Sequence, residues 1–203
     1  MSYWDAPRPV RRRRAIDVDA LARAAAELLD LGGFPALTMR AAAERLGVAA
    51  ASLYSRVRGV DDLRDLALDA ALADDGSMQQ AVAEAAIDEL MLAYFRHLRR
   101  HPCAGQVIAL RTPRGPHYLA LSERMCVLLR DAGMADPLGC AYALSNLVIG
   151  SALTSAMAAG EQAALVDPTI APVYAELHAG HTVDPEQILT AAVQALLAAA
   201  PTR

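Results

Sequence analysis

One stretch in the first third of the chain holds small, hydroxyl-bearing and cationic side chains at spacings that suit contact with a nucleic acid. The short side chains of Ala50, Ala51 and Ser52 would let one end of a helix enter the major groove of DNA. There an alanine methyl group can touch a thymine methyl, and a serine hydroxyl can bond to a base edge or a phosphate. Tyr54 could reach a phosphate or a base through its hydroxyl, and Arg56 could bind guanine or phosphate.

Each of these residues also has a purely structural interpretation. Alanines within a helix often reflect helix propensity alone, and Tyr54 could instead pack in the core of a small domain. Arg56, and Arg40 one helix earlier, could be solvated surface charges rather than contacts to DNA. The whole pattern is more specific than any single residue, because a threonine, two apolar pairs, a Gly-Val pair and a Leu-Tyr pair follow one another.

Two short helices joined by a tight turn would position these side chains. Thr38 is a suitable N-cap for the first helix, and Gly47 suits the turn because glycine accepts a left-handed backbone. The second helix is expected over about 50–57, with Leu53 and Val57 facing inward. This layout is that of a helix-turn-helix.

A longer helix is predicted on each side of this pair. The preceding helix spans about 17–31 and ends at Gly32 and Gly33, since glycine closes helices readily. The following helix begins near Asp61 and Asp62, where negative charge suits the positive end of the helix dipole. The three helices before residue 60 and this fourth one would form a small helical domain.

Two features precede these helices. Residues 1–10, with two prolines and the lone tryptophan, are predicted to be a flexible tail. Four consecutive arginines follow at 11–14, from Arg11 to Arg14. Such runs are often arms without a fixed contact, but directly before a helix-turn-helix an arm that reaches along the DNA is the favoured interpretation.

Composition and charge agree with a helical protein that has one basic end. Hydrophobic residues make up 55% of the chain and aromatic residues only 4%, so the core must be built from Ala, Leu, Val and Met, and an all-α fold is expected. Residues 1–60 carry a net charge of +4 and residues 61–203 carry −8, which suits a polyanionic partner at one end only. Every basic residue is arginine, which coding bias in a GC-rich genome explains.

The rest of the chain is predicted to be a second helical domain. The residues at 74–77 indicate a boundary. Further helices are expected over about 78–100, 103–111, 115–132, 137–159 and 185–200, and 161–184 is expected to be a loop with a short helix. Residues 137–160 lack charge and are long enough to cross a bilayer, but their alanine and hydroxyl content favours a helix packed within the protein.

No enzyme or metal motif stands out. GxSxG, HExxH and glycine-rich phosphate loops are absent from the sequence, and His178 with His181 lacks a third ligand, so neither a metal nor a cofactor is expected. Cys103, Cys126 and Cys140 are scattered, which predicts buried reduced thiols in a cytosolic protein. No secretion signal is indicated, because the charged N-terminus is not followed by an apolar run.

At residues 37–63 the sequence LTMRAAAERLGVAAASLYSRVRGVDDL resembles the DNA-binding domain of the TetR family of transcriptional repressors. The resemblance covers about 11–72 and extends more weakly to HYLALSERMCVLLRDAGM (117–134) and AYALSNLVIG (141–150), which resemble a tetracycline-repressor type of ligand-binding domain. It implies a helix-turn-helix domain over 11–72 and a ligand-binding and dimerisation domain over 77–203. By position, it places at the DNA the residues Thr38, Arg40, Ala50, Ala51, Ser52, Tyr54, Ser55 and Arg56.

Two positions depart from the family pattern. Position 49 is alanine where the family often has a capping serine or threonine, and position 60 is valine where a phosphate-binding lysine is common. Arg58 or the arginine arm could compensate for the missing lysine. The departures affect details of the DNA contact rather than the layout of the domain.

The resemblance also implies a ligand pocket among the helices after the DNA-binding domain. Tetracycline itself is not expected, because its magnesium chelate needs a histidine and a glutamate, and matching positions are lacking in 107–111 and 137–160. An uncharged or mildly anionic aromatic natural product is expected instead, with Arg111 as a counter-charge. Asn146 is the polar residue in an apolar helix that a ligand or a neighbouring helix would satisfy. The candidate lining residues are Tyr94, Phe95, Leu98, Val107, Arg111, His117, Tyr118, Leu121, Met125, Asn146 and Ile149, most of which could also be plain core.

The sequence therefore predicts a cytoplasmic, ligand-responsive transcriptional regulator that is not an enzyme. Its expected partners are a palindromic double-stranded operator, a small-molecule effector and a second copy of the chain, without a membrane. The helices at 137–159 and 185–200 are the expected dimer contacts, because both are alanine-rich and nearly uncharged. The alternatives are a helical enzyme and a helical adaptor that does not bind DNA. The effector, the operator, the regulated genes and the choice between repression and activation are not encoded in any motif.

Overall fold

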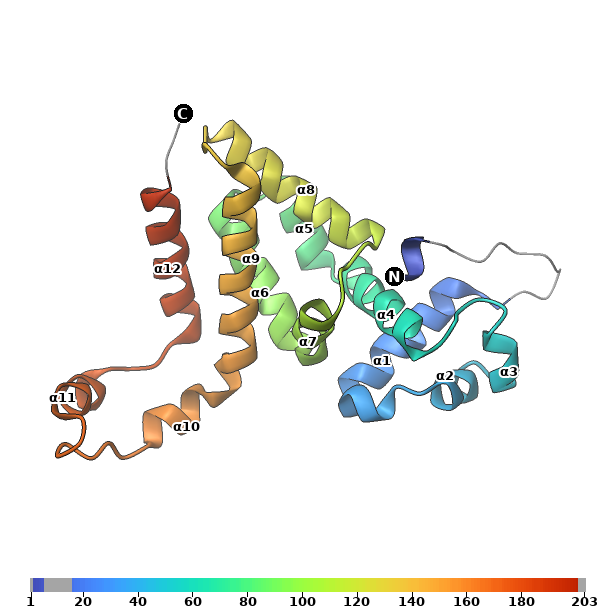
Figure 1. The fold of residues 1–203 in the computed structure, drawn as a ribbon, viewed down its shortest axis with the longest axis horizontal. Coiled ribbons are helices and arrows are strands. Elements are labelled where there is room, and N and C mark those ends of the chain that lie inside the picture. The colour runs from blue at the N-terminus through green and yellow to red at the C-terminus, as the bar shows by residue number, and fades with distance from the viewer. Residues whose placement is uncertain (1, 6–15, 201–203) are drawn as a thin grey trace.

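The computed structural model describes residues 2–5 and 16–200, and the secondary-structure elements found there are all helices (Figure 1). The predicted all-α fold is confirmed. In chain order the elements are η1 (Tyr3–Asp5), α1 (Val18–Ala36), α2 (Met39–Arg45), α3 (Ala50–Leu53), α4 (Val60–Asp74), α5 (Gly76–Glu84), α6 (Ile87–Arg100), α7 (Pro102–Leu110), α8 (Pro116–Asp131), α9 (Pro137–Thr154), η2 (Ser155–Met157), α10 (Ala158–Ala163), α11 (Pro172–Gly180) and α12 (Pro185–Ala199).

Helices α1 to α4 form the head of the molecule, with α1 packed along α4 and the α2–α3 pair beside them (Figure 1). The predicted cap is confirmed, because the Thr38 hydroxyl accepts a hydrogen bond from the Ala41 amide at 3.0 Å. Gly47 has a φ of 64° at the predicted turn. The regular part of α1 breaks at Gly33, whose φ is 67°, so the expected glycine stop is also observed, followed by one more turn.

Three local predictions were wrong. The second helix of the pair ends at Leu53 rather than near residue 57, and residues 54–56 form a turn. The helix expected over 78–100 is two helices, α5 and α6, because Ala85 and Ala86 adopt extended backbone angles. An Arg124 guanidinium from α8 donates to the Ala85 carbonyl at 3.0 Å, so a contact distant in sequence fixes this break.

The third correction concerns residues 2–5 of the predicted flexible tail, whereas residues 1 and 6–10 lie outside the described residues. Residues Tyr3–Asp5 form a short 3-10 turn that packs against α4, and Tyr3 is only 5% exposed. The Tyr3 and Trp4 rings meet edge to face at 5.1 Å between centroids. The arginine run at 11–14 lies outside the described residues.

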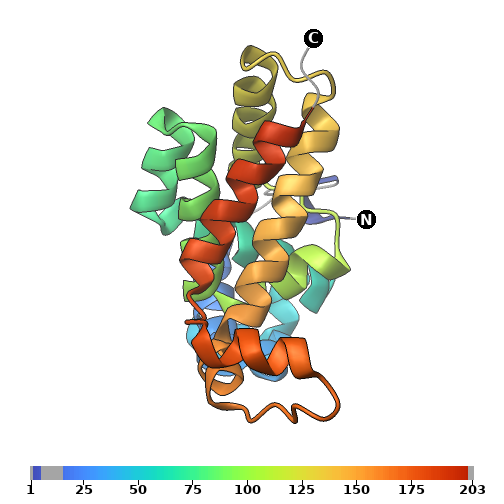
Figure 2. The same cartoon turned by 90° about the vertical axis from the view of Figure 1, so that its left-hand side faces the viewer.

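Helices α5 to α12 form the body. Helix α9 packs against α6 and α8, and α12 covers α6 and α9 on the end of the molecule away from the head (Figures 1 and 2). Proline begins five of these helices, α7, α8, α9, α11 and α12, and all but α11 start at or next to a predicted helix start. The buried side chains of head and body form one continuous core. In the body, Cys140 is buried, whereas Cys103 and Cys126 are half-buried, and the three thiols are unpaired.

Helix α9 buries only one face within its own chain. Its buried residues are Cys140, Ala141, Leu144 and Val148, so the expected burial inside the protein holds for this face alone. Among the described residues, the segment Pro137–Met157 is long and apolar enough to cross a membrane, judged by length and composition alone. In its 18-residue apolar stretch, 17% of the residues are buried within the chain. The outer face carries exposed apolar side chains, including Tyr142 at 64% exposure.

Candidate nucleic-acid interface and effector region

The short helix α3 and the turn after it present one buried face and one exposed face. Leu53 and Val57 have no exposed surface and anchor the element in the core of the head. On the opposite side Ser52 and Ser55 are exposed, and Tyr54 is half exposed, so the alternative of a core tyrosine is excluded. Ala51 is also exposed and Ala50 is half-buried, which leaves a slim outer edge of small and hydroxyl-bearing side chains.

Helix α2 places two further predicted contact residues near this edge. Thr38 is exposed at its N-terminus, with its oxygen engaged as the cap. Arg40 projects into solvent and pairs with Glu44 one turn later, at 2.8 Å from Nε to Oε1. A surface pair of this kind contributes little to stability, so the Arg40 guanidinium can exchange a carboxylate for a phosphate at small cost.

Arg56 differs from the expectation. It is only 7% exposed, so the structure does not place it on the groove side with Ser55 and Tyr54. Helix α3 ends early, at Leu53, and the turn over 54–56 leaves Arg56 close enough to Tyr3 for its charge to act on the Tyr3 hydroxyl. No capping side chain precedes α3, where Ala49 replaces the usual serine or threonine.

Residues 50–57, which comprise α3 and the turn after it, are named here the recognition turn. Arg58 follows this turn and supplies a cation, at the start of the segment where Val60 replaces the usual lysine. Its side chain is one-third exposed, and its guanidinium binds Asp62, with Nη2 2.6 Å from Oδ1 and Nε 2.9 Å from Oδ2. Burial raises the pKa of the Asp62 carboxyl, but hydrogen bonds from Arg58 outweigh this and hold the pKa below its ordinary value. Arg58 is therefore held in place by a buried anion.

The predicted effector residues divide into two groups. The larger group lies together in the body, where α6, α7, α8 and α9 meet. Ile149 and Tyr118 are half-buried and pack against the same cluster. The fully buried members are Tyr94, Phe95, Leu98, Val107, Leu121 and Met125.

Tyr94 carries an unusual polar group within this cluster. Its hydroxyl is buried, and among the described residues the Tyr118 hydroxyl interacts with it without reaching normal hydrogen-bond geometry. Burial raises its pKa well above 10, and the neighbouring Tyr118 raises it further. A buried hydroxyl of this kind is costly unless something satisfies it.

The other predicted effector residues point elsewhere. Arg111, at the end of α7, binds Asp65 of α4 with Nε 2.6 Å from Oδ1. His117, at the start of α8, binds Asp69 of α4 with Nδ1 2.9 Å from Oδ2. Asn146 lies on the exposed side of α9.

A hollow of about 220 Å³ lies beside the buried cluster. It is bordered by the ends of α6 and α9 and by the first turns of α7, and Leu98 belongs to both the hollow and the cluster. Leu153 forms part of its wall and approaches Gly105 closely, since a Cβ at that glycine would lie 3.2 Å from a Leu153 methyl carbon. Leu98 is the buried residue of α6 that lines this hollow.

The sequence interpretation missed a row of buried carboxylates on α4. Asp62, Asp65 and Asp69 are each at most 5% exposed, and each binds a different segment of the chain. Asp62 binds Arg58, Asp65 binds Arg111 and residues 2–3, and Asp69 binds the start of α8. Their spacing of three and four residues puts them on one helix face. This spacing was the feature of the sequence from which a shared row of carboxylates could have been predicted.

Comparison with known proteins identifies the head. A family model described as "Bacterial regulatory proteins, tetR family" matches residues 21–63. The chain is 37% identical over 158 residues to an HTH-type transcriptional regulator of Saccharopolyspora erythraea, covering 74% of this chain and 66% of that protein. It is 32% identical over 162 residues to the HTH-type transcriptional repressor DrrR1 of Streptomyces coeruleorubidus, covering 73% and 58%. The chain thus spans about two thirds or less of the length of these curated relatives.

Solved structures extend the similarity to the body. ActR of Streptomyces coelicolor, a TetR family protein solved in complex with (S)-DNPA, superposes with a TM-score of 0.73 at 27% identity, over 92% of this chain and 99% of ActR. The complex of ActR with actinorhodin gives a TM-score of 0.71 at 25% identity, over 90% and 95%. The similar proteins are named as regulators and not as enzymes.

Proposed function

The chain belongs to the TetR family of bacterial regulatory proteins, and we propose that it is a repressor that binds operator DNA and releases it when a small molecule binds. The observation that carries this proposal is the two-faced recognition turn. Leu53 and Val57 are fully buried, whereas Ser52, Tyr54 and Ser55 are exposed along one edge. A slim exposed edge on a firmly anchored helix is what entry into a major groove requires.

The proposed DNA contacts are of two kinds. Ala50, Ala51 and Ser52 would face base edges, with methyl groups against thymine and the hydroxyl as a hydrogen-bonding group. Tyr54, Ser55, Thr38 and Arg40 would bind phosphates and set the register. Arg11 to Arg14 are proposed as a further phosphate-binding arm. Arg56 is proposed to act indirectly, because its burial makes it a support for the recognition turn.

We propose a homodimer formed through α9 and α12. The two helices lie side by side on one end of the body (Figure 2), and α9 contains no charged residue. The exposed apolar side chains on these helices are Leu138, Tyr142, Leu153 and Ile188. Two copies packed through this surface would form a four-helix bundle. A symmetric pair of heads would then match a palindromic operator.

The effector is proposed to bind in the body around Tyr94 and the hollow next to Leu98. The Tyr94 hydroxyl would be satisfied by a hydrogen-bonding group of the ligand, and the surrounding Leu, Met and Phe side chains suit an aromatic skeleton. ActR, with the same fold, has been solved with actinorhodin and with (S)-DNPA. An uncharged or mildly anionic aromatic natural product is therefore the proposed class.

Binding to DNA fragments selected from a random pool tests this function. Purified protein should enrich a duplex with an inverted repeat, and its affinity should fall steeply as salt rises, since arginine contacts release counterions from DNA. A fragment of the DNA upstream of its own gene is the natural second probe. Lack of enrichment at low ionic strength would favour the helical adaptor, and turnover of a substrate would favour the enzyme. A DNA-binding function would place the protein in the cytoplasm.

A further inference from the structure

Residues Ser2–Asp5, named here the N-terminal clamp, are attached to the first half of α4. The Tyr3 amide donates to Asp65 Oδ2 at 2.7 Å, and the Ser2 hydroxyl donates to the same oxygen at 3.1 Å. Asp65 is 4% exposed and Ser2 is 6% exposed. Hydrogen bonds to a buried carboxylate are among the strong ones in proteins, so this attachment is specific rather than incidental.

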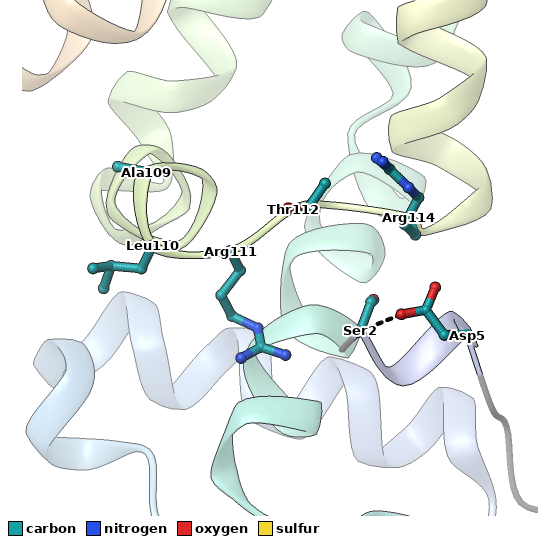
Figure 3. Close-up of a pocket in the computed structure, with 7 residues that line it drawn as sticks. All are labelled: Ser2, Asp5, Ala109, Leu110, Arg111, Thr112 and Arg114. Carbon is teal, nitrogen blue, oxygen red and sulfur yellow. Dashed lines mark hydrogen bonds between the residues drawn. The ribbon is translucent and has the colours of Figure 1, made fainter.

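The same carboxylate also binds the body of the protein. Arg111 follows the last turn of α7, and its Nε and Nη2 donate to Asp65 Oδ1 and Oδ2 at 2.6 and 2.9 Å. Figure 3 shows the Arg111 side chain reaching from the α7–α8 connection toward α4, with Ser2 and Asp5 on the neighbouring side. A hollow of about 540 Å³ lies between the clamp and this connection.

On its other side the clamp touches the residue that follows the recognition turn. Arg58 Nη2 donates to the Ser2 carbonyl at 2.9 Å while the same guanidinium holds Asp62. Tyr3 also lies near Arg56: burial raises the pKa of the Tyr3 hydroxyl, and the Arg56 charge opposes this. A continuous set of hydrogen bonds thus runs from Arg58 through Ser2 and Asp65 to Arg111.

We propose that the N-terminal clamp positions the recognition turn for DNA and joins it directly to the effector-binding body through Asp65 and Arg111. This inference rests on the proposed function as a DNA-binding regulator. The clamp is bonded to Arg58, and both the clamp and Arg111 of the body bind the same carboxylate, Asp65. If the clamp is detached from α4, the recognition turn becomes more mobile. DNA binding must then order this turn, which lowers the affinity for DNA.

The test uses the full chain with Tyr3→Pro, which removes the amide donor and the buried ring, and Tyr3→Phe, which keeps both. Fluorescence anisotropy on the selected duplex should show affinity reduced about tenfold for Tyr3→Pro and unchanged for Tyr3→Phe. The slope of affinity against salt should stay the same, because the clamp positions the turn without binding phosphate. Circular dichroism checks that both variants are folded, and Ser2→Ala provides a milder variant if Tyr3→Pro does not fold.

Arg111→Ala makes the test specific to the proposed connection. If clamp and Arg111 act through the shared carboxylate, the double variant should bind DNA about as weakly as the weaker single variant, whereas independent effects would multiply. A folded Tyr3→Pro variant with wild-type affinity, a reduced salt slope, or multiplying effects would overturn the inference.

Amide hydrogen exchange separates this inference from the proposed function. If the wild type binds DNA and the inference is correct, exchange at residues 54–66 should be faster in Tyr3→Pro than in Tyr3→Phe. If the wild type binds no duplex, the proposed function fails, and the positioning role for DNA fails with it. If the wild type binds DNA but exchange is equal in the two variants, only the clamp inference fails.

Discussion

Asp69 of α4 binds both the backbone and the side chain of His117 at the start of α8. Its Oδ1 accepts the His117 amide at 2.9 Å and its Oδ2 lies 2.9 Å from His117 Nδ1. The carboxylate thereby serves as an N-cap supplied by a different helix, which satisfies donors that the start of α8 would otherwise leave open. Helix α4 of the head is attached in this way to α8 of the body.

Gly115→Ala should break this attachment. A Cβ at Gly115 would lie 2.1 Å from Asp69 Oδ1, so the buried carboxylate would have to leave its site. We expect unfolding free energy in urea to fall by about 1–3 kcal/mol. Gly76→Ala is the matched control, because a Cβ there meets nothing within 4 Å. Equal stability of the two variants would show that the carboxylate is not needed at α8.

Tyr54→Ala should weaken DNA binding without changing stability. Tyr54 is half exposed at the outer edge of the recognition turn, so its removal leaves the core of the head intact. We expect a loss of about tenfold or more in affinity, as for other direct contacts to DNA, together with an unchanged melting temperature. Tyr54→Phe separates the hydroxyl from the ring. A variant with wild-type affinity would remove Tyr54 from the interface.

Arg40 and Arg56 should behave differently despite their identical side chains. Arg40 is a solvent-exposed cation, so Arg40→Ala should lower the slope of log affinity against log salt by about 1 and leave stability unchanged. Arg56 is buried, so Arg56→Ala should lower the melting temperature as well as DNA affinity. DNA binding measured over a range of salt concentrations, together with thermal unfolding of both variants, distinguishes the exposed contact role of Arg40 from the supporting role of Arg56. Matching effects on stability would contradict the difference in burial.

His97 should make stability sensitive to mild acid. The ring is fully buried, with Nδ1 2.8 Å from Asp75 Oδ2, and burial lowers the pKa of His97 below its ordinary 6.5 despite this carboxylate. His101 and Arg100 beside it lower the pKa further. As the pH falls, His97 is protonated in the unfolded chain before it is protonated in the folded protein. The unfolding free energy should therefore decrease as the pH drops below 6.5 toward the lower pKa that His97 has in the folded protein.

Urea unfolding over this pH range, with His97→Gln as the control, measures the effect. The variant should lack the loss of stability that begins at pH 6.5. Both proteins should lose further stability below pH 3.8, since hydrogen bonds from Ser77, His97 and Arg100 outweigh burial and hold the pKa of Asp75 far below that value. Parallel curves for wild type and variant above pH 4 would exclude His97 as the source.

Much of the fold could be predicted because its signals are local. Thr38, Gly47 and the prolines that start α7, α8, α9 and α12 fix element ends through backbone chemistry, which does not depend on distant contacts. The inward position of Leu53 follows from helical periodicity, whereas Val57 is buried although it lies beyond the end of α3.

The errors occurred where distant contacts decide the structure. The break at Ala85 has neither glycine nor proline and is held by Arg124 of α8. Residues 2–5 show no periodic pattern, yet Asp65 fixes them against α4. Arg111 was predicted as a counter-charge to a ligand and His117 as a lining residue of the implied pocket, but neither prediction included the carboxylates that bind them. Those carboxylates lie about fifty residues earlier, on a helix face whose acidic residues look like solvated surface.

Stoichiometric binding to a selected inverted repeat tests the central claim most directly. Sedimentation velocity of the full chain, free and with a fluorescent duplex, gives the number of chains in solution and on the DNA. Two chains should be present in each case, and a duplex with one half of the repeat destroyed should bind far more weakly, because symmetric heads must both find a half-site. A chain that stays single and leaves every duplex unbound at low ionic strength would contradict the claim.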